Sequence, residues 1–312
     1  MQRGRDALGM FAIQSVALNK NFRQVRAVHD VNLSVDEGSV YALMGPNGAG
    51  KTTLIKLLMN LMTPTAGHIS VLGANARTLE GKSLEKVGYV SENQKLPGWM
   101  SAGMFLAYCR PFYPTWDAAL EQRLIKRFNL PLKRRLKHLS RGMKMKAALC
   151  SALAFRPKLL VLDEPLSGLD PLVRDDLMES LSELDPGTTV LLSSHDLAEI
   201  ESFASHIGYM DDGRLLLSES ILNVRASYRR IIATGGSPLA IPPTLPAEWL
   251  QFKSEGIAAQ WTETAYDPQR TVSRAREVLG EVELSATPLT LREVFLTMAR
   301  INRPTAQDKP LL

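Results

Sequence analysis

The pattern of apolar and polar residues divides the chain into strand-like and helix-like stretches. Apolar and polar residues alternate over 11–16, so folded structure is expected to begin there, with residues 1–9 as an N-terminal tail. Residues 39–44 are a compact apolar run that predicts a buried strand. A glycine loop over 45–50 and a helix over 51–62, with apolar residues at helical spacing, follow directly.

Two further apolar runs have the composition of buried strands. Residues 158–162 follow Pro157, and residues 188–192 follow the turn pair Pro186-Gly187. Neither run alternates, which is typical of parallel strands whose two faces are covered by helices. Together with the strand at 39–44 they predict an α/β fold.

The rest of the chain predicts a helical insertion and a separate C-terminal region. Residues 96–155 carry apolar residues at helical spacing together with several prolines, which indicates short helices. After about residue 220, turn-forming segments appear at 235–238 and 241–246. The elements expected in this small α+β region are two helices and a strand, over 267–279, 291–301 and 281–284.

Composition indicates a globular chain in a reducing environment. The 312 residues are 45% apolar and 22% charged, as in ordinary globular proteins of one or two domains. No apolar run approaches the roughly 18 residues that a membrane helix needs. The N-terminal residues lack the apolar core of a secretory signal, so a cytoplasmic chain is expected. Cys109 and Cys150 have no partner at metal-ligand or redox spacing and are expected to be buried and reduced.

The formal net charge of +5 comes from one segment of the chain. Nine basic and no acidic residues lie between Lys126 and Lys146, so the rest of the chain is net negative. A single basic segment is not the signature of a nucleic-acid-binding protein. We favour a solvated helix face over a binding patch for these residues.

The glycine loop has the spacing of a phosphate-binding loop. Small residues let successive backbone N–H groups turn inward around phosphate oxygens at the start of a helix. Lys51 would reach the β- and γ-phosphates of a nucleotide, and Thr52 would place its hydroxyl on Mg²⁺. An ordinary turn before a helix is the alternative, which the flanking strand and helix disfavour. The residues expected to bind the nucleotide are Gly45, Pro46, Asn47, Gly48, Ala49, Gly50, Lys51, Thr52 and Thr53.

Two carboxylates follow the apolar run at 158–162. Asp163 and Glu164 are expected at the C-terminal end of a parallel strand, where open α/β sheets bind their ligands. Asp163 would hold Mg²⁺, directly or through water. Glu164 would accept the proton of the attacking water, a role typically worth about 10²- to 10⁴-fold in rate. For the motif by itself, an acidic pair that caps the turn before Pro165 is the alternative.

Five segments occur in a characteristic order along the chain. They are the loop at 45–53, Leu139-Ser140-Arg141-Gly142, Leu162-Asp163-Glu164-Pro165, Ser167-Gly168-Leu169-Asp170 and Ser194-His195-Asp196. In order and approximate spacing, over about residues 11–220, the chain resembles ATP-binding cassette (ABC) domains. The resemblance implies an α/β P-loop NTPase fold, the ABC-type nucleotide-binding domain, with an antiparallel β subdomain and a helical subdomain. The implied domains are an ABC ATPase domain over 10–220, with the helical subdomain at about 96–155, and a small α+β region over 221–312.

The resemblance implies further roles for single residues. Phe22 sits where the family's aromatic residue stacks on adenine, and a core position is the equal alternative. Ser140 and Gly142 match the signature motif, which in the family completes the ATP site of the opposite protomer with a helix N-terminus. A helix N-cap is the alternative for Ser140, and the two roles are compatible. The motif departs from the family pattern at Arg141 and Met143, where glycine and glutamine are common.

Three polar positions complete the implied site. Glu92 lies where the family brings a glutamine to the metal and the attacking water, and a carboxylate can also bind Mg²⁺ or orient water. Gln94 is the less favoured alternative for that role. His195 resembles the switch histidine that contacts the γ-phosphate, with a structural histidine as the alternative. Asp170 resembles the residue that links the two protomers.

Aromatic residues crowd the start of the helical insertion. Most of them are expected to be core. In the family, this segment forms the groove that receives a short cytoplasmic helix of the membrane subunit, and an exposed apolar patch would suit that partner. The aromatic residues are Trp99, Phe105, Tyr108, Phe112, Tyr113 and Trp116.

The resemblance implies the ATP-binding and ATP-hydrolysing subunit of an ABC transporter of bacterial export type, with ATP and Mg²⁺ as cofactors. Two copies, or this chain with a similar ATPase subunit, would close around ATP and drive translocation through a separately encoded transmembrane subunit. That subunit would hold the chain on the inner face of the cell membrane.

Two rival functions remain at this point. A soluble cassette ATPase acting on nucleic acid or ribosomes predicts a long coiled-coil insertion or a second cassette, and the sequence has neither. A regulatory ABC subunit that binds ATP and barely hydrolyses it is suggested by Arg141, Met143 and Glu92.

Overall fold

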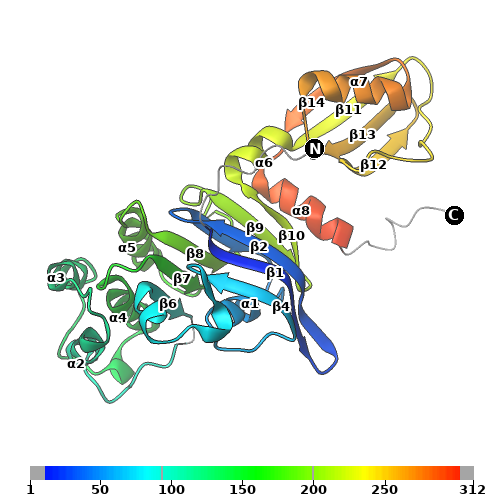
Figure 1. Cartoon of the computed structure of the whole chain (residues 1–312). Coiled ribbons are helices and arrows are strands. Elements are labelled where there is room, and N and C mark those ends of the chain that lie inside the picture. Colours follow the sequence, from blue (N-terminus) through cyan, green and yellow to red (C-terminus); the bar gives the residue numbers. More distant parts are fainter. Residues whose placement is uncertain (1–10, 93, 199, 303–312) are drawn as a thin grey trace. The chain divides into compact units, whose positions relative to one another are not determined.

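The computed structural model describes residues 11–92, 94–198 and 200–302. The chain divides into two compact units, of which the first runs to Ser218 and the second starts at Glu219 (Figure 1). The tail expected over 1–9 lies outside the described residues. Within the described ranges, every helix is too short or too polar to cross a lipid bilayer.

The first unit is built around a central sheet with the strand order β10-β9-β3-β8-β7-β6. Strand β3 pairs in parallel with β8 and β9, and β7 pairs in parallel with β6 and β8. All residues of β7 and β8 are buried, which explains the unbroken apolar runs in their sequences. The strands are β3 (Val40–Met44), β6 (Val87–Ser91), β7 (Leu159–Asp163), β8 (Thr189–Ser194), β9 (His206–Asp211) and β10 (Arg214–Ser220).

An antiparallel outer sheet has the order β2-β1-β4-β5. Its inward-facing apolar residues share one hydrophobic core with helix α1 (Lys51–Leu58) and the central sheet. Its strands are β1 (Phe11–Phe22), β2 (Val25–Asp36), β4 (Ala66–Val71) and β5 (Ala74–Asn75). Two 3₁₀ turns follow, η1 (Ala76–Thr78) and η2 (Gly81–Lys86).

Helix α1 is shorter than the sequence pattern predicted. The expected helix over 51–62 ends at Leu58 because Asn60 adopts a left-handed conformation with φ of 54°. The N–H of Leu61 donates to the carbonyl oxygen of Lys56, and the N–H of Asn60 donates to that of Leu57. This pair of hydrogen bonds is a Schellman motif, which closes the last turn and ends the helix.

The helical insertion lies beside β6 (Figure 1). Its helix α4 (Arg141–Leu153) contacts β6, and α2 and α3 contact α4. The remaining elements here are α2 (Ala102–Cys109), η3 (Arg110–Phe112), α3 (Ala118–Arg127) and η4 (Leu136–His138). Helix α5 (Pro171–Ser182) follows β7.

The expectation that most aromatic residues of this insertion are core is wrong. Trp99, Tyr108 and Phe112 have 65%, 57% and 58% of their surface exposed. Phe105 is buried, and the ring of Tyr113 stacks on Phe155 at 3.9 Å between centroids.

The second unit is an antiparallel sheet with helices and its own core. The sheet order is β12-β13-β11-β14, and α7 lies across one face (Figure 1). The strand expected over 281–284 is the first part of β14, which continues to Pro288 because it pairs along the whole of β11. The elements are α6 (Ile221–Ser227), β11 (Arg229–Gly235), β12 (Trp249–Glu255), β13 (Ala258–Glu263), α7 (Pro268–Leu279), β14 (Val282–Pro288) and α8 (Leu291–Asn302).

Candidate functional site

The C-terminal ends of the parallel strands bring distant motifs together. Met44, which precedes the glycine loop, lies opposite Ser194. Asp163 lies opposite Ser193 on one side and Ser91 on the other. Since each of these strand ends leads directly into a predicted motif, the sheet assembles the motifs at its C-terminal end.

The glycine loop turns sharply into α1. Gly50, the N-cap, has φ of 105°, a left-handed conformation that favours glycine. A Cβ atom at this position would lie 2.3 Å from the backbone oxygen of Ala27, so a larger residue would clash. Pro46, Asn47 and Gly48 are exposed, and the first N–H groups of a helix have no partner within the helix. The loop therefore offers an open anion site at a helix N-terminus.

Lys51 points back into the loop from the first residue of α1. Its side chain is 5% exposed, and Nζ donates to the carbonyl oxygens of Gly45 at 2.6 Å and Pro46 at 3.3 Å. The same ammonium lies 3.1 Å from Oε1 of Glu164. A buried ammonium needs such partners, and a phosphate could replace them without leaving the charge unpaired.

The Glu164 carboxylate lies between Lys51 and His195. Its Oε2 is 2.8 Å from Nδ1 of His195, while Oε1 is buried and has only the ion pair with Lys51, outside hydrogen-bond geometry. The backbone of Glu164 is left-handed, with φ of 50°, a conformation that is uncommon outside glycine and concentrates at functional sites. The predicted base is therefore held beside both the phosphate-loop lysine and the predicted switch histidine.

Asp163 is buried beside the hydroxyl of Thr52. Thr52 Oγ1 donates to Oδ1 of Asp163 at 3.0 Å, and Ser193 Oγ donates to the same oxygen at 2.9 Å. Burial raises the pKa of the Asp163 carboxyl group, although these two hydrogen bonds lower it in part. Ser193 also accepts the N–H of Glu164 at 2.9 Å. Ser193 was not predicted from the sequence, because its place opposite Asp163 depends on the register of β7 and β8.

The Thr52–Asp163 pair has the chemistry of a magnesium site. Both groups offer hard oxygen atoms, and Mg²⁺ is usually bound through one or two carboxylates together with substrate phosphates. Among the described residues, no group of three or more His, Cys, Asp or Glu residues could hold a metal alone. The residues present therefore fit an ion that arrives with a nucleotide.

The backbone of Glu92 is hydrogen-bonded to that of Asp163, but its side chain is bonded to Arg141 and Ser167. Its N–H donates to the carbonyl oxygen of Asp163 at 2.9 Å. Its Oε1 accepts a hydrogen bond from Nη2 of Arg141 and another from Ser167 Oγ at 3.1 Å. Gln94, the alternative, is exposed, and its Oε1 accepts the N–H of Ser91 at 3.4 Å. Among the described residues, neither side chain forms a hydrogen bond with Thr52 or Asp163.

The signature segment and Asp170 lie at helix starts on the surface. Ser140 caps α4 by accepting the N–H of Met143 at 3.2 Å, which confirms its N-cap reading. Asp170 caps α5 by accepting the N–H of Val173 at 3.1 Å. A Cβ atom on Gly142 would lie 3.4 Å from the methyl groups of Val173. Ser140 and Asp170 are both exposed, so a second molecule can reach them.

Phe22 is not part of the core. Its side chain is 43% exposed, and Lys20 Nζ lies 5.0 Å from the ring centroid. The core alternative for Phe22 is therefore wrong, and its ring is accessible for stacking.

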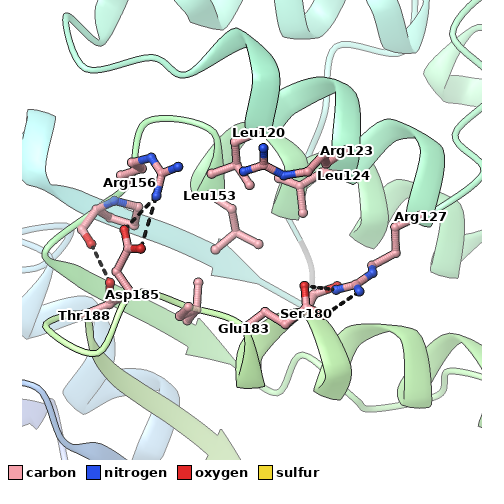
Figure 2. A pocket seen from close by; sticks show the side chains of 12 residues that line it. Leu120, Arg123, Leu124, Arg127, Leu153, Arg156, Ser180, Glu183, Asp185 and Thr188 are labelled. Atoms are coloured by element: carbon pink, nitrogen blue, oxygen red, sulfur yellow. Dashed lines mark hydrogen bonds and ion pairs between the residues drawn. The ribbon is translucent and has the colours of Figure 1, made fainter.

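A hollow in the first unit lies away from this site (Figure 2). Its volume is about 250 Å³, and it lies near Pro157 and Thr188, which precede β7 and β8, at the opposite end of the sheet. Arg127 and Arg156 on its wall pair with Glu183 at 2.6 Å and Asp185 at 2.9 Å (Figure 2). The remaining lining residues are Leu120, Arg123, Leu124, Leu153, Ser180 and Leu184. This hollow is not where the nucleotide motifs converge.

Part of the basic segment serves internal ion pairs. Arg127 pairs with Glu183, Lys146 with Asp176 at 2.6 Å, and Arg141 with Glu92. These pairs join the helical insertion to the rest of the first unit, so the segment is neither wholly solvated nor a free basic patch.

The geometry defines a class of protein. A phosphate loop lies between the parallel strand β3 and a helix, and its lysine meets a carboxylate that follows β7, a parallel strand of the same sheet. This is the arrangement of P-loop nucleotide hydrolases.

Comparison with known proteins makes the class specific. Residues 28–167 match the ABC transporter family. The chain is 34% identical over 226 residues to the uncharacterized ABC transporter ATP-binding protein YcbN of Bacillus subtilis (strain 168), covering 71% of this chain and 74% of that protein. It is 34% identical over 221 residues to the lantibiotic transport ATP-binding protein SrtF of Streptococcus pyogenes, covering 67% and 90%. It is 31% identical over 234 residues to the bacitracin transport ATP-binding protein BcrA of Enterococcus faecalis, covering 70% and 73%.

A solved structure supports the same conclusion. The ATP-binding subunit of an ABC transporter matches with a TM-score of 0.63 at 29% identity, over 69% of this chain and 92% of that one. The chain belongs to the ABC transporter family, as an ATP-binding subunit that hydrolyses ATP.

Proposed function

We propose that this chain is the ATPase of an export system and acts through a separately encoded transmembrane subunit. The observation that carries the proposal is the 3.1 Å contact between Lys51 Nζ and Glu164 Oε1. This contact joins two residues that are far apart in sequence, the proposed phosphate-binding cation and the proposed general base, and so supports a single nucleotide site.

Each residue of the site has a definite task in this proposal. ATP phosphates bind the N–H groups of the glycine loop, and Lys51 exchanges its carbonyl contacts for the β- and γ-phosphates. Glu164 accepts the proton of the attacking water, and His195 orients the Glu164 carboxylate through their 2.8 Å contact. Thr52 and Asp163 would hold Mg²⁺, which would supply charge neutralisation at the phosphates when bound.

The proposed dimer uses the helix starts on the surface. Ser140, Gly142 and Asp170 belong to the face that a second copy, or a similar ATPase subunit, would meet. The free N–H groups at the start of α4 then complete the partner's phosphate site. Phe22 provides an exposed ring for the adenine base.

A membrane subunit is the proposed partner of the exposed aromatic patch, defined as Trp99, Met104, Tyr108 and Phe112. Met104 and Tyr108 are one turn apart on α2, and the ring of Tyr108 meets Phe112 edge-on at 5.4 Å. The four side chains are 52% to 65% exposed. An amphipathic cytoplasmic helix of the membrane subunit would cover them. The chain would thereby be held at the inner face of the membrane.

The relatives suggest a class of cargo. SrtF and BcrA are described as lantibiotic and bacitracin transport proteins. Export of antimicrobial peptides or similar drugs is therefore the substrate class that we propose for this chain.

Phosphate release by the purified chain tests the proposal. Glu164→Gln should lower the rate by about 10²- to 10⁴-fold while ATP still binds, because only the base is removed. Lys51→Ala should lose both ATP binding and hydrolysis. Glu37→Gln, a neutralised glutamate on the exposed surface, is the matched control and should keep the wild-type rate.

The same variants test dimer closure and membrane docking. Glu164→Gln should form an ATP-dependent dimer in sedimentation velocity, and Phe112→Glu should release a co-expressed membrane subunit without changing hydrolysis in solution. Equal and negligible phosphate release by wild type and Glu164→Gln would instead favour the regulatory subunit that binds ATP and barely hydrolyses it. The ion pair between Glu92 and Arg141 of the same chain is the observation that favours a regulatory subunit as the second candidate.

A further inference from the structure

One oxygen of Glu92 is shared by two segments of the first unit. Arg141, the first residue of α4, donates through Nη2 to Oε1 of Glu92, and Ser167 Oγ donates to the same atom at 3.1 Å. Ser167 lies in the turn that connects Glu164 to α5. The Glu92 carboxylate therefore links the start of α4 to the segment between β7 and α5.

The guanidinium of Arg141 also packs against that turn. Gly168 has φ of 64°, and a Cβ atom there would lie 2.8 Å from Nη1 and 3.2 Å from Cζ of Arg141. The space that glycine leaves is thus filled by the guanidinium group. Arg141 contacts both the Glu92 carboxylate and the backbone of this turn.

The other carboxylate oxygen of Glu92 is available. Among the described residues, Oε2 accepts no hydrogen bond, and the N–H of Glu92 is bonded to the carbonyl oxygen of Asp163 at 2.9 Å. The backbone thus fixes Glu92 next to the Thr52–Asp163 pair, and Arg141 with Ser167 fixes Oε1. Within the described ranges, Oε2 is thus the part of the Glu92 carboxylate that no hydrogen bond holds.

The Arg141–Glu92 pair is poorly placed to serve stability alone. The side chains of Arg141 and Glu92 are 46% and 28% exposed, and exposed ion pairs add little to folding. The planar guanidinium, in contrast, fixes geometry well because its donors form a rigid fork. Its contribution is therefore expected in the positioning of Glu92.

We propose that Arg141 is a positioning residue that couples Glu92 to the first turn of α4. The inference rests on the proposed function, in which that turn faces the nucleotide of the partner subunit. When the partner's nucleotide engages the start of α4, Arg141 moves with the helix and sets the position of Glu92 near the chain's own nucleotide. Arg141, which replaces a common glycine in the signature, thus links hydrolysis at one site to occupancy of the other.

Steady-state ATP hydrolysis by the full chain tests this coupling. Arg141→Ala should lower kcat by about 10- to 100-fold, as for a misplaced catalytic group. KM for ATP should stay within about 2-fold because Lys51 and the glycine loop are untouched. Arg141→Lys should recover part of the rate, since a lysine can still pair with Glu92 as a point charge. Lys144→Ala, a charge removed from the same helix, should leave kcat unchanged.

A double-mutant cycle separates action through Glu92 from direct action on the partner's nucleotide. In single-turnover measurements on a Glu92→Ala background, adding Arg141→Ala should slow the reaction by less than about 2-fold. A further 10-fold loss there, or an unchanged kcat in the single Arg141→Ala variant, would overturn the proposal. Ser167→Ala removes the other donor to Oε1 of Glu92 and should likewise have little effect on the Glu92→Ala background. This second cycle tests the proposal even if the Arg141 variant does not fold. If Glu164→Gln lowers the rate of hydrolysis, the proposed function is supported whatever the Arg141 variants show.

Discussion

At the residue scale, Asp163 shows how the site opposes the stability of the fold. Its carboxyl group is buried, which raises its pKa, and the hydrogen bonds from Ser193 and Thr52 lower it only in part. The native chain therefore binds this proton more tightly than the unfolded chain does. As pH rises from the ordinary aspartate pKa through the raised native value, this group lowers the free energy of unfolding. Above the raised native pKa of Asp163, its ionised carboxylate lowers the stability of the fold.

Asp163→Asn should therefore raise the thermal stability of the nucleotide-free chain at mildly alkaline pH. Asparagine keeps an oxygen that can accept from Thr52 and Ser193, so the hydrogen bonds remain while the buried charge is removed. The gain should disappear near the ordinary aspartate pKa of about 3.9, where the unfolded wild-type group also takes up its proton. Calorimetry across pH measures this difference. A lower melting temperature for the variant at alkaline pH would contradict the assignment, while hydrolysis should be lost in either case.

At the element scale, a serine N-cap begins both α2 and α4. Ser101 caps α2 by accepting the N–H of Met104 at 3.2 Å, as Ser140 caps α4. The local chemistry of the two caps is the same. What distinguishes them is that α4 starts at the signature segment, whereas α2 carries the aromatic patch.

The two serines form a matched pair of variants. Ser101→Ala and Ser140→Ala should each weaken the first turn of their helix by about 1 kcal/mol, because one backbone N–H loses its acceptor. Hydrogen exchange followed by mass spectrometry measures this at each helix start. Hydrolysis should fall only for Ser140→Ala, because only that hydroxyl faces a partner's nucleotide in the proposed function. Equal rates for the two variants would remove Ser140 from the site.

At the scale of the whole molecule, each unit has its own hydrophobic core. In the second unit, Trp249 and Trp261 stack at 4.1 Å between centroids, and Ile231 and Ala275 pack into the same cluster. A separate core of this kind is what defines an independently folding domain.

We expect residues 219–312 to fold alone, with a cooperative urea transition followed by near-UV circular dichroism. Trp261→Ala should cost the fragment about 3–5 kcal/mol, because the indole is 1% exposed. Ile232→Ala, at a side chain that is 40% exposed in the same sheet, should cost far less. A fragment without a cooperative transition would show that the second unit depends on the first.

Local patterns predicted the elements that carry the phosphate chemistry. The strands at 158–162 and 188–192 correspond to β7 and β8, and the C-terminal helices correspond to α7 and α8. Strands β11, β12 and β13 were missed because their pairing is antiparallel and partly exposed, so no unbroken apolar run marks them. The end of α1 was missed because Asn60 stops the helix through a backbone conformation rather than a change in polarity.

The sequence by itself determined the phosphate loop, the acidic pair and the family, because these depend on residue types at fixed short spacing. Only the tertiary structure decided that Lys51 meets Glu164, that Ser193 bridges Asp163 to the Glu164 backbone, and that Glu92 turns toward Arg141. These contacts depend on strand register and on where a helix starts in space. Both are set by long-range packing of the core, which no short pattern of residues records.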